Sequence, residues 1–465
     1  MQRAQSALFV VFIAMMGMTR LWNQTTAITD VTVIDPRTHA VLAHRTVVIE
    51  GDRIKEIKAA SEEPPRGAHL ISGRQKFLIP GLWDAHVHLS KSGVLSLALF
   101  VANGVTGVRD MGSDLHEVAE WRSRIKAGTL IGPRIKTAGY YLESRANVDR
   151  MKREGTVEPV DRLRIGVANP AEGRAAVARL AREGADHIKM RTTPDQDTFR
   201  AVGDEAKRQG LPFTAHPIAP PEELMRAGLR SVEHVLAFPP VDRTAEERRA
   251  LFQQMARQRL FMSDTSVNLD ALISTPYREV KRHVDDSDGR VDVRRKYVCG
   301  YLIADWREQV EELKDPAAVK GYASVRQALP RLDRDIREMR EAGVQFLAGT
   351  DTGVLLMYPG FSLHDELRKL VRDLGFTAMQ ALQIATSNVA SFYDQEPQFG
   401  AIGAGQAADL VLLDADPLAD IANTTKIRGV MAQGRWLDRA ALDTLRRDIE
   451  QAADSDCSGL SLSPC

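Results

Sequence analysis

Several residue types and patterns are scarce in this sequence of 465 residues, and each scarcity excludes a class of protein. The three cysteines, Cys299, Cys457 and Cys465, form no C-x-x-C pair, which argues against a thiolate metal site. Basic and acidic residues both number 62, so no excess of positive charge indicates nucleic acid as a partner. Aromatic residues make up only 6%, and no apolar run is long enough to span a membrane.

The first 26 residues resemble a secretory signal. An apolar run from Ala7 to Met18 follows Arg3, which matches the charged start and hydrophobic core of such signals. We therefore expect export to the periplasm or the outside. No clear A-x-A cleavage site follows the run, so an N-terminal extension or a misassigned start is the alternative, and the protein would then be cytoplasmic.

The last 25 residues, 441–465, are expected to form a helix and a tail. The tail is rich in small residues and contains Cys457 and Cys465. In an oxidising compartment this pair can close a small disulfide loop. Two free thiols in an unstructured tail are the equal alternative.

Both ends of the chain have the pattern of β-structure. Residues 27–79 and 397–440 contain short β-branched segments separated by Asp-Pro and Gly-containing turns. The middle of the chain lacks this pattern. We therefore predict a small β-sandwich domain built from both ends, with the middle inserted into it.

The middle, residues 80–396, alternates between apolar strands and helix-like segments. This alternation is typical of parallel strands joined by helical crossovers. The predicted strands lie at 77–88, 104–110, 133–139, 185–190, 211–216, 231–234, 260–264 and 344–351. Eight such repeats predict an α/β fold, a TIM-like (β/α)8 barrel.

One stretch, from Asp264 to Arg331, departs from this alternation of strands and helices. It is long, charged and mostly helical in pattern, and it follows the seventh predicted strand. An insertion there would sit over the mouth of the barrel. It is either a solvated helical addition to the surface, or it acts as a lid or in binding substrate.

Polar residues end five of the predicted strands. In a (β/α)8 barrel the carboxyl ends of the strands carry the catalytic groups. His86 and His88 are two residues apart, so their side chains point the same way on a strand and suit a divalent metal such as zinc. Singly, each of these residues has a structural explanation, but together they indicate one site. The set is His86, His88, Lys189, His216, His234 and Asp351.

These residues stand in motifs by which the chain resembles the amidohydrolase superfamily, specifically its imidazolonepropionase-like and prolidase-like branch. The motifs are PGLWDAHVHL, GVTGVRDMG, GADHIKM, FTAHP, SVEHV, LAGTDTG and GAIGAGQAADLVLLDADP. Relatives in this branch include metal-dependent Xaa-Pro dipeptidases, carboxypeptidases and enzymes that hydrolyse ochratoxin-like amides. The resemblance extends from about Thr26 to Leu437.

The resemblance implies a binuclear metal centre, with Zn²⁺ as the expected ion. It implies that Lys189 is carboxylated and bridges the two ions. His86, His88 and Asp351 would complete the shell of one ion, and His216 and His234 would hold the other. The chemistry is sound, because a neutral buried lysine can take up carbon dioxide and become an anionic ligand with two oxygens. Asp351 would also transfer the proton in catalysis.

The sequence departs from its relatives after the third strand. Many relatives carry Gly-Gly-His there, whereas this chain reads TAGYYLESRANVDR without a histidine. Substrate contacts from that loop therefore cannot be transferred. Tyr140, Tyr141 and Arg145 occupy the same region and are the candidates for binding substrate.

These observations predict a hydrolase that cleaves an amide or peptide bond next to a C-terminal amino acid. Its substrates would be small molecules, namely dipeptides or N-acyl amino acids, and we expect a homo-oligomer. The first alternative is a mononuclear enzyme that opens a cyclic amide or deaminates its substrate. Lys189 argues against it, because mononuclear members usually lack that bridge. A non-catalytic binding protein is the second alternative, and the full set of ligand-type residues argues against it.

Overall fold

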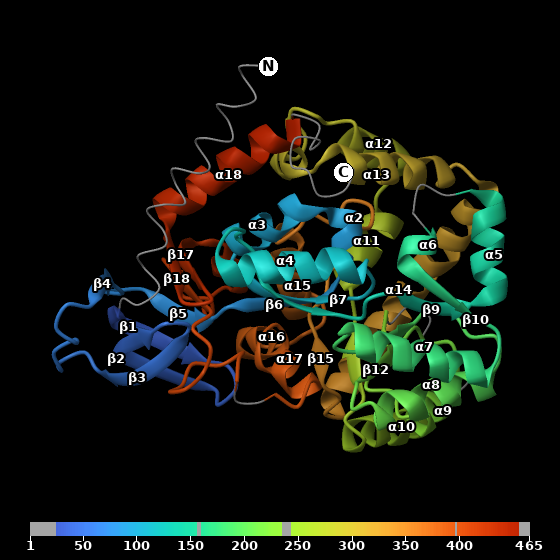
Figure 1. The fold of residues 1–465 in the computed structure, drawn as a ribbon, viewed down its shortest axis with the longest axis horizontal. Helices are drawn as coiled ribbons and strands as arrows, with labels where there is room; N and C mark the ends of the chain where they lie inside the picture. Colours follow the sequence, from blue (N-terminus) through green and yellow to red (C-terminus); the bar gives the residue numbers. More distant parts are fainter. Residues whose placement is uncertain (1–24, 156–159, 235–242, 396–397, 455–465) are drawn as a thin grey trace.

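The computed structural model describes residues 25–155, 160–234, 243–395 and 398–454. They form an α/β fold with two parallel sheets at the centre and a mixed sheet at one end (Figure 1). Most of the predicted signal segment, up to residue 24, lies outside the described residues, as do Cys457 and Cys465. No helix in the described part of the chain is long and apolar enough to cross a membrane.

The mixed sheet contains strands from both ends of the chain, in the order β18-β17-β16-β5-β1-β2-β3, with β4 beside β1. The two ends meet where β5 pairs with β16 in antiparallel fashion, with Leu78 opposite Leu412. The predicted β-structure at both ends is thus present as one sheet. Its strands are β1 (Thr26–Asp35), β2 (Ala40–Glu50), β3 (Arg53–Ala59), β4 (His69–Ser72), β5 (Phe77–Pro80), β16 (Leu410–Leu413), β17 (Ile427–Ala432) and β18 (Arg435–Asp438).

All eight strands predicted for the middle of the chain are present. A three-stranded sheet has the order β6-β7-β8, and a seven-stranded sheet contains β11-β12-β13-β14-β15 in sequence order. Every described pair within these sheets is parallel. The strands are β6 (Leu82–Val87), β7 (Val105–Asp110), β8 (Arg134–Thr137), β11 (Ile188–Met190), β12 (Phe213–Ala215), β13 (Ser231–Glu233), β14 (Phe261–Ser263) and β15 (Phe346–Leu347).

Backbone hydrogen bonds also join the two parallel sheets to each other. At one seam the Asp186 amide donates to the Thr137 carbonyl at 2.7 Å, beside β8 and β11. At the other seam the Ala85 amide on β6 donates to the Ala348 carbonyl after β15, also at 2.7 Å. These contacts bring the carboxyl ends of the strands toward one region.

The seven-stranded sheet has two strands that the sequence did not predict. β9 (Tyr141–Ser144) pairs with β11 and with β10 (Arg164–Val167), which forms the outer edge. β9 lies in the segment where the sequence departs from its relatives, and it places Tyr141 next to the end of β6.

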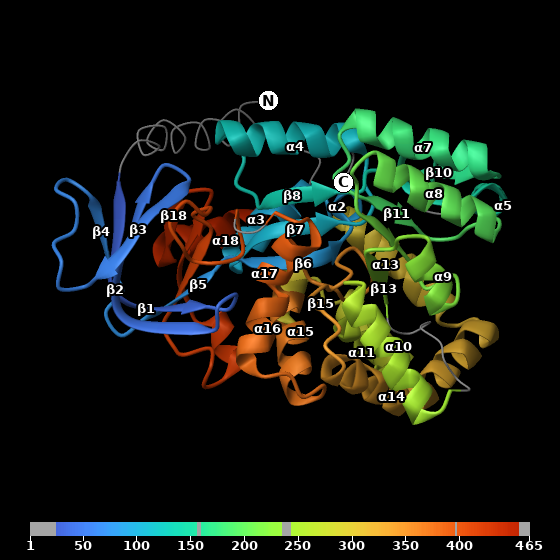
Figure 2. The same cartoon turned by 90° about the horizontal axis from the view of Figure 1, so that it is seen from below.

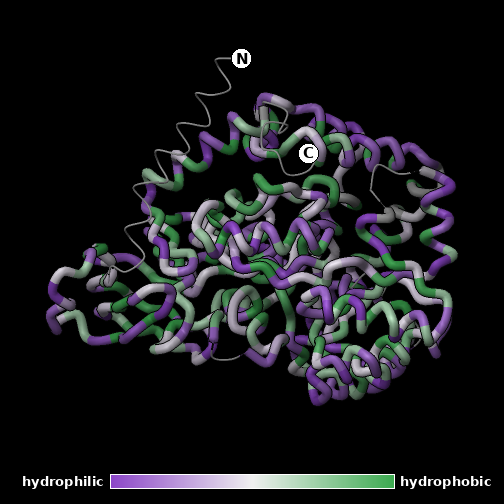
Figure 3. Tube along the Cα trace, in the orientation of Figure 1, coloured by the Kyte–Doolittle hydropathy of each residue, from purple (hydrophilic) through white to green (hydrophobic). Residues whose placement is uncertain are grey.

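Helices connect the strands and cover the parallel sheets (Figure 2). The connecting helices include α3 (Val94–Ala102), α4 (Leu115–Ala127), α7 (Pro170–Glu183), α8 (Gln196–Arg208), α9 (Pro221–Arg226), α10 (Ala245–Arg257) and α15 (Phe361–Arg372). In Figure 3 the tubes of these helices change between hydrophobic and hydrophilic colours along their length, as expected for helices with one face on a core. The C-terminal helix α18 (Arg439–Asp454) is present as predicted.

The insertion after β14 is helical, but its end differs from the prediction. It contains α11 (Ser266–Ser274), α12 (Tyr277–Val284), the short 3₁₀ helix η2 (Val293–Tyr297) and α13 (Gly300–Glu312). The predicted boundary at Arg331 falls inside α14 (Pro316–Glu341), which runs through Pro330 and onward to β15. The helix is continuous through Pro330, although a proline within a helix usually disrupts it, so the structure has no break at Arg331.

Close packing joins the mixed sheet to the parallel strands at Gly81, between β5 and β6. A Cβ atom at this position would lie only 1.9 Å from the hydroxyl oxygen of Thr106 on β7. The Gly81 amide also donates to the Asp409 carbonyl at 2.8 Å, just before β16. A side chain at residue 81 would therefore separate β6, which carries the two histidines, from β7.

Candidate metal centre and active site

The structure brings the histidines predicted from the strand ends close together. His86 and His88 come from the end of β6, and His216 and His234 directly follow β12 and β13. Ring centroids are 5.5 Å apart for His86 and His88, 4.6 Å for His86 and His234, and 5.0 Å for His216 and His234. The spatial convergence expected from the strand order is thus present.

Asp351, which follows β15, lies among these rings. Its Oδ1 is 2.9 Å from Nε2 of His88 and 3.4 Å from Nε2 of His86, and its Oδ2 is 4.0 Å from Nε2 of His234. One ligand atom each of His86, His234 and Asp351 lie within 4.8 Å of one another. This spacing suits a metal ion bound between nitrogen and oxygen donors.

Three of the histidines are oriented in the same way, through Nδ1. His86 Nδ1 donates to Glu233 at 2.8 Å, while Tyr141 and Thr265 hydroxyls lie 2.7 and 2.8 Å from Nδ1 of His88 and His234. In each case Nε2 is left to face Asp351. Fixing one ring nitrogen so that the other can bind a metal is the usual arrangement of histidine ligands.

The charge state of these rings also suits metal binding. Burial lowers the pKa of His86 to about 4 and that of His234 to about 3, and it lowers the pKa of His216 well below the usual value. The rings are therefore neutral at pH 7, which is the form that binds a metal. Burial alone would raise the pKa of Asp351, but the nearby His86 and His88 outweigh this and hold it well below the usual value.

Lys189 on β11 is completely buried, and its Nζ has no hydrogen-bond partner among the described residues. Burial lowers its pKa to about 7, against the opposing effect of Glu233. A neutral amine is therefore accessible at neutral pH. His86 Nε2 is a second buried polar atom without a hydrogen-bond partner among the described residues. Buried polar groups are rarely left unpaired, so both atoms fit a site that takes a further group.

Backbone strain is concentrated at the same place. His234, Thr265 and Asp351 have φ angles of 68°, 52° and 62°, in the left-handed region that non-glycine residues rarely adopt. A Cβ at Gly349 would lie 2.6 Å from Cβ of His86, so β15 approaches β6 only because this residue is glycine. Such strain persists where the surrounding structure enforces it, often at functional sites.

The structure places the three candidate substrate residues differently. Tyr141 contacts His88 through its hydroxyl group. Tyr140 is buried and lies beneath the guanidinium of Arg179, with 5.3 Å between the Arg179 Cζ and the ring centroid. Arg145 donates to Glu172 and to the Gly166 carbonyl, both at 2.8 Å. Of the three, Tyr141 is therefore the one with a contact to the histidine cluster among the described interactions.

Sequence reasoning missed a buried ion pair beneath the site. Arg109 donates from Nη2 to both oxygens of Glu233, at 2.9 and 2.8 Å, and from Nε to the Ala85 carbonyl at 2.6 Å. Both side chains are fully buried. Both residues stand in motifs quoted above, Glu233 in SVEHV and Arg109 in GVTGVRDMG. They lie on β13 and β7, which are not neighbouring strands, so the sequence did not show that they pair.

The start of the insertion also contributes to the site. Thr265 contacts His234, and the Asn268 amide donates to Oδ2 of Asp351 at 2.9 Å. The insertion also packs onto the loop after Asp351 through a cluster that includes Trp306 and Tyr358. These contacts favour an active-site role for the insertion over a solvated decoration.

The fold and the site define a class: an α/β protein with parallel strands whose carboxyl ends gather neutral imidazoles, a carboxylate and a buried lysine. Residues 278–437 match the model of the amidohydrolase family. The predicted resemblance to the amidohydrolase superfamily is therefore confirmed, and the chain is a hydrolase of the kind that acts on C–N bonds.

Two relatives and one solved structure are similar to this chain over most of its length. The chain is 25% identical over 402 residues to ochratoxinase of Aspergillus niger, covering 75% of this chain and 72% of that one. It is 24% identical over 404 residues to imidazolonepropionase of Rubrobacter xylanophilus, covering 81% and 86%. A solved structure described as a prolidase from Bifidobacterium longum aligns with a TM-score of 0.66 and 24% identity, covering 92% and 99%.

Proposed function

We propose that this protein is a binuclear metal-dependent amidohydrolase that cleaves an amide bond next to a C-terminal amino acid. The substrates would be dipeptides or N-acyl amino acids, including ochratoxin-like amides. The observation that carries the proposal is the arrangement of neutral histidines and Asp351 at one end of the parallel strands, close to β11 and its buried Lys189. The names of the similar ochratoxinase and prolidase support the choice of bond.

We also propose the finer fold that this chemistry needs. The two parallel sheets would close into a (β/α)8 barrel, and the mixed sheet would belong to a β-sandwich domain formed from both chain ends. The hydrogen bonds at the two seams, Asp186 to Thr137 and Ala85 to Ala348, support closure. A closed barrel would direct the carboxyl ends of all eight strands into one mouth.

In the proposed site, Lys189 is carboxylated and would hold two ions, with zinc as the expected metal. His86, His88 and Asp351 would complete one shell, and His216 and His234 the other. The residues fit this role because the rings are neutral and Lys189 Nζ lacks a partner among the described residues. Two divalent ions supply an activated water and polarise the scissile carbonyl.

The protein's own residues would position the groups and move the proton. Glu233, held by Arg109, fixes the His86 ring so that Nε2 faces the site. Asn268 holds one carboxylate oxygen of Asp351 and leaves the other beside the histidines. Asp351 would accept a proton from the attacking water and give it to the leaving amine.

Arg191 is our candidate for binding the substrate carboxylate, and the sequence did not single it out. It follows β11 two residues after Lys189, and its side chain is 35% exposed. Its Cζ lies 5.6 Å from the ring centroid of Tyr141, which contacts His88. Its ion pair with Glu143 is long, 3.9 Å, and Glu143 already accepts a hydrogen bond from Arg164. The guanidinium is therefore available to an anionic group near the histidines.

Replacing Arg191 with methionine should raise KM for N-acyl amino acids by about 10-fold or more, because a hydrogen bond to a charged group is lost. The kcat should change much less, and substrates with an amidated C-terminus should be turned over equally by both proteins. Arg145→Met is the matched control, since Arg145 already pairs with Glu172 and should leave KM unchanged. A rise in KM with Arg145→Met but not with Arg191→Met would reverse the assignment.

The number of metals tests the central proposal. Elemental analysis of active, unchelated protein should find two divalent ions per chain, and chelation should remove activity that added zinc restores. The finding of one ion would favour the second candidate function, a mononuclear hydrolase of a cyclic amide or a deaminase. The group of His86, His234 and Asp351 and the similarity to imidazolonepropionase are the observations that favour that alternative.

A further inference from the structure

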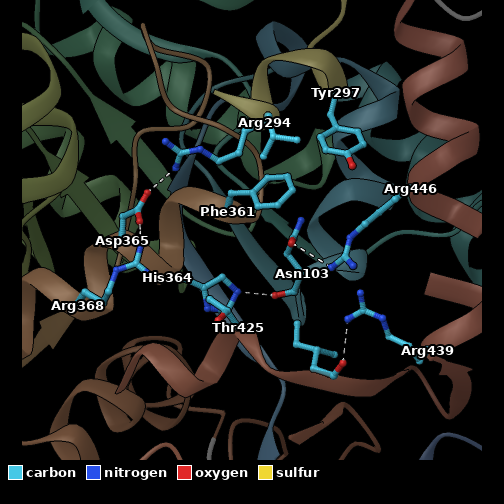
Figure 4. Close-up of a pocket in the computed structure, with 12 residues that line it drawn as sticks. Asn103, Arg294, Tyr297, Phe361, His364, Asp365, Arg368, Thr425, Arg439 and Arg446 are labelled. Atoms are coloured by element: carbon cyan, nitrogen blue, oxygen red, sulfur yellow. Dashed lines mark hydrogen bonds and ion pairs between the residues drawn. The ribbon is translucent and has the colours of Figure 1, made fainter. Parts of the chain in front are cut away.

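A second feature of the molecule is a cavity of about 320 Å³ between α15, η2, α18 and β17 (Figure 4). None of the six candidate metal ligands lines it. Its volume lies in the range of small-molecule binding sites. Its wall contains four arginines and two aromatic rings: Arg294, Arg368, Arg439, Arg446, Tyr297 and Phe361.

Two of the four arginines are neutralised within the cavity. Asp365, the one acidic residue of the lining, accepts from Nη1 of Arg294 at 2.6 Å and also pairs with Arg368. Arg294 in addition donates three hydrogen bonds to Asp292. On this side of the cavity the positive charges of the two arginines are therefore balanced by the carboxylates of Asp365 and Asp292.

The opposite side, formed by α18, is less well compensated. Arg439 and Arg446 share one carboxylate, that of Asp443, with nitrogen–oxygen distances of 3.0 and 3.7 Å. Arg439 also donates to Asp443 from Nε at 3.1 Å and to the Ile427 carbonyl from Nη1 at 3.3 Å. Arg446 also donates from Nη2 to the Ala102 carbonyl at 2.5 Å and to Oδ1 of Asn103 at 3.4 Å, and its buried Nε has no partner among the described residues. Figure 4 shows both guanidinium groups directed toward the cavity.

The ionisation of these groups agrees with excess positive charge. Burial lowers the pKa of Arg446, and the neighbouring Arg439 lowers it further. An anion bound between them would reduce this repulsion.

The aromatic rings line the same space. Tyr297 of η2 and Phe361 of α15 are stacked, with centroids 5.7 Å apart and planes inclined by 23°. Both rings belong to the cavity lining together with the arginines. They offer an apolar wall for a flat or hydrocarbon portion of a ligand.

We propose that this cavity is a binding site for a small organic anion. Its carboxylate or phosphate group would be bound by Arg439 and Arg446, and its apolar portion would lie against Tyr297 and Phe361. Because the wall comes from the insertion, a connecting helix and the C-terminal helix, the bound anion would hold these three parts together. The proposal does not depend on the reaction at the metal centre.

Calorimetric titration of the full chain with phenyl phosphate, benzoate and inorganic phosphate tests this site. Phenyl phosphate or benzoate should bind saturably, raise the Tm, and bind more tightly than inorganic phosphate. The difference between the first two ligands tells which anionic group is preferred. Arg446→Met and Arg439→Met should each weaken binding by about 10-fold or more, because a charged hydrogen-bond donor is lost.

Arg447→Met is the matched control, since Arg447 lies on the same helix, is not part of the lining, and donates to Thr444. It should bind the ligands like the unmodified protein. Arg439 is half exposed, so Arg439→Met should fold even if Arg446→Met does not. The proposal is wrong if no ligand binds, if Arg439→Met and Arg446→Met bind normally, or if Arg447→Met loses affinity to the same degree. Equal affinity for inorganic and phenyl phosphate would show that Tyr297 and Phe361 do not contribute to binding.

Discussion

Replacement of Asp351 by asparagine is expected to lower kcat for an unactivated amide by about 10²–10⁴-fold, the contribution of a positioned acid–base group. The amide keeps the shape of the carboxylate and can still accept the hydrogen bond from Asn268, so the local geometry should persist. It cannot accept and release the proton. The loss should therefore remain when excess metal is added, and it should shrink for esters or anilides, whose leaving groups need less protonation.

Asp264→Asn is the control for this result. Asp264 follows β14 as Asp351 follows β15, and it is also buried, but its described contact is Ser266 rather than a histidine. This variant should lose less than about 10-fold in kcat. An Asp351→Asn enzyme with full metal content and normal turnover of an unactivated amide would show that another group transfers the proton.

Lys189→Ala is the second replacement with a large expected effect. It removes the proposed bridging ligand, so metal content should fall and activity should drop by at least about 100-fold. It also leaves a buried cavity at the end of β11. Formate, acetate or propionate should enter this cavity, supply the missing carboxylate and restore part of both the activity and the metal content.

Lys189→Met separates this explanation from simple destabilisation. Methionine fills nearly the same volume, so the variant should fold, yet it can neither take up carbon dioxide nor leave room for an added acid. It should be inactive and should not respond to carboxylic acids. If Lys189→Met retained two metals and near-normal activity, the carboxylated lysine would have to be abandoned.

The strands and the histidine cluster were predictable because each depends on local sequence. Short apolar segments such as FMS and IKM are separated by helices at regular spacing, and parallel strands align their ends by topology alone. His86, His234 and Asp351 therefore had to lie near one another once the strand order was known. Their spacing in the structure agrees with that expectation.

The remaining features depend on contacts between residues that are distant in sequence. The pairing of Arg109 with Glu233 joins two strands that are not neighbours, and the sequence patterns of β7 and β13 do not reveal it. The contact of Asn268 with Asp351 depends on how the insertion folds back over the site. The pattern of the insertion placed its end at Arg331, which lies inside the continuous helix α14.

The pairing of β5 with β16 sets an order of events during biosynthesis. Leu78 pairs with Leu412, which is synthesised roughly 330 residues later, so this partner is absent while most of the chain is being made. Until then the edge of β5 is open, and closing so long a loop is slow compared with forming the strand–helix units in between. The strands and helices between β5 and β16 can thus assemble first, and the mixed sheet is completed only when translation has passed residue 413. A chain cut short before β16 would retain all six candidate metal ligands and still lack the strand that holds its N-terminal sheet in place.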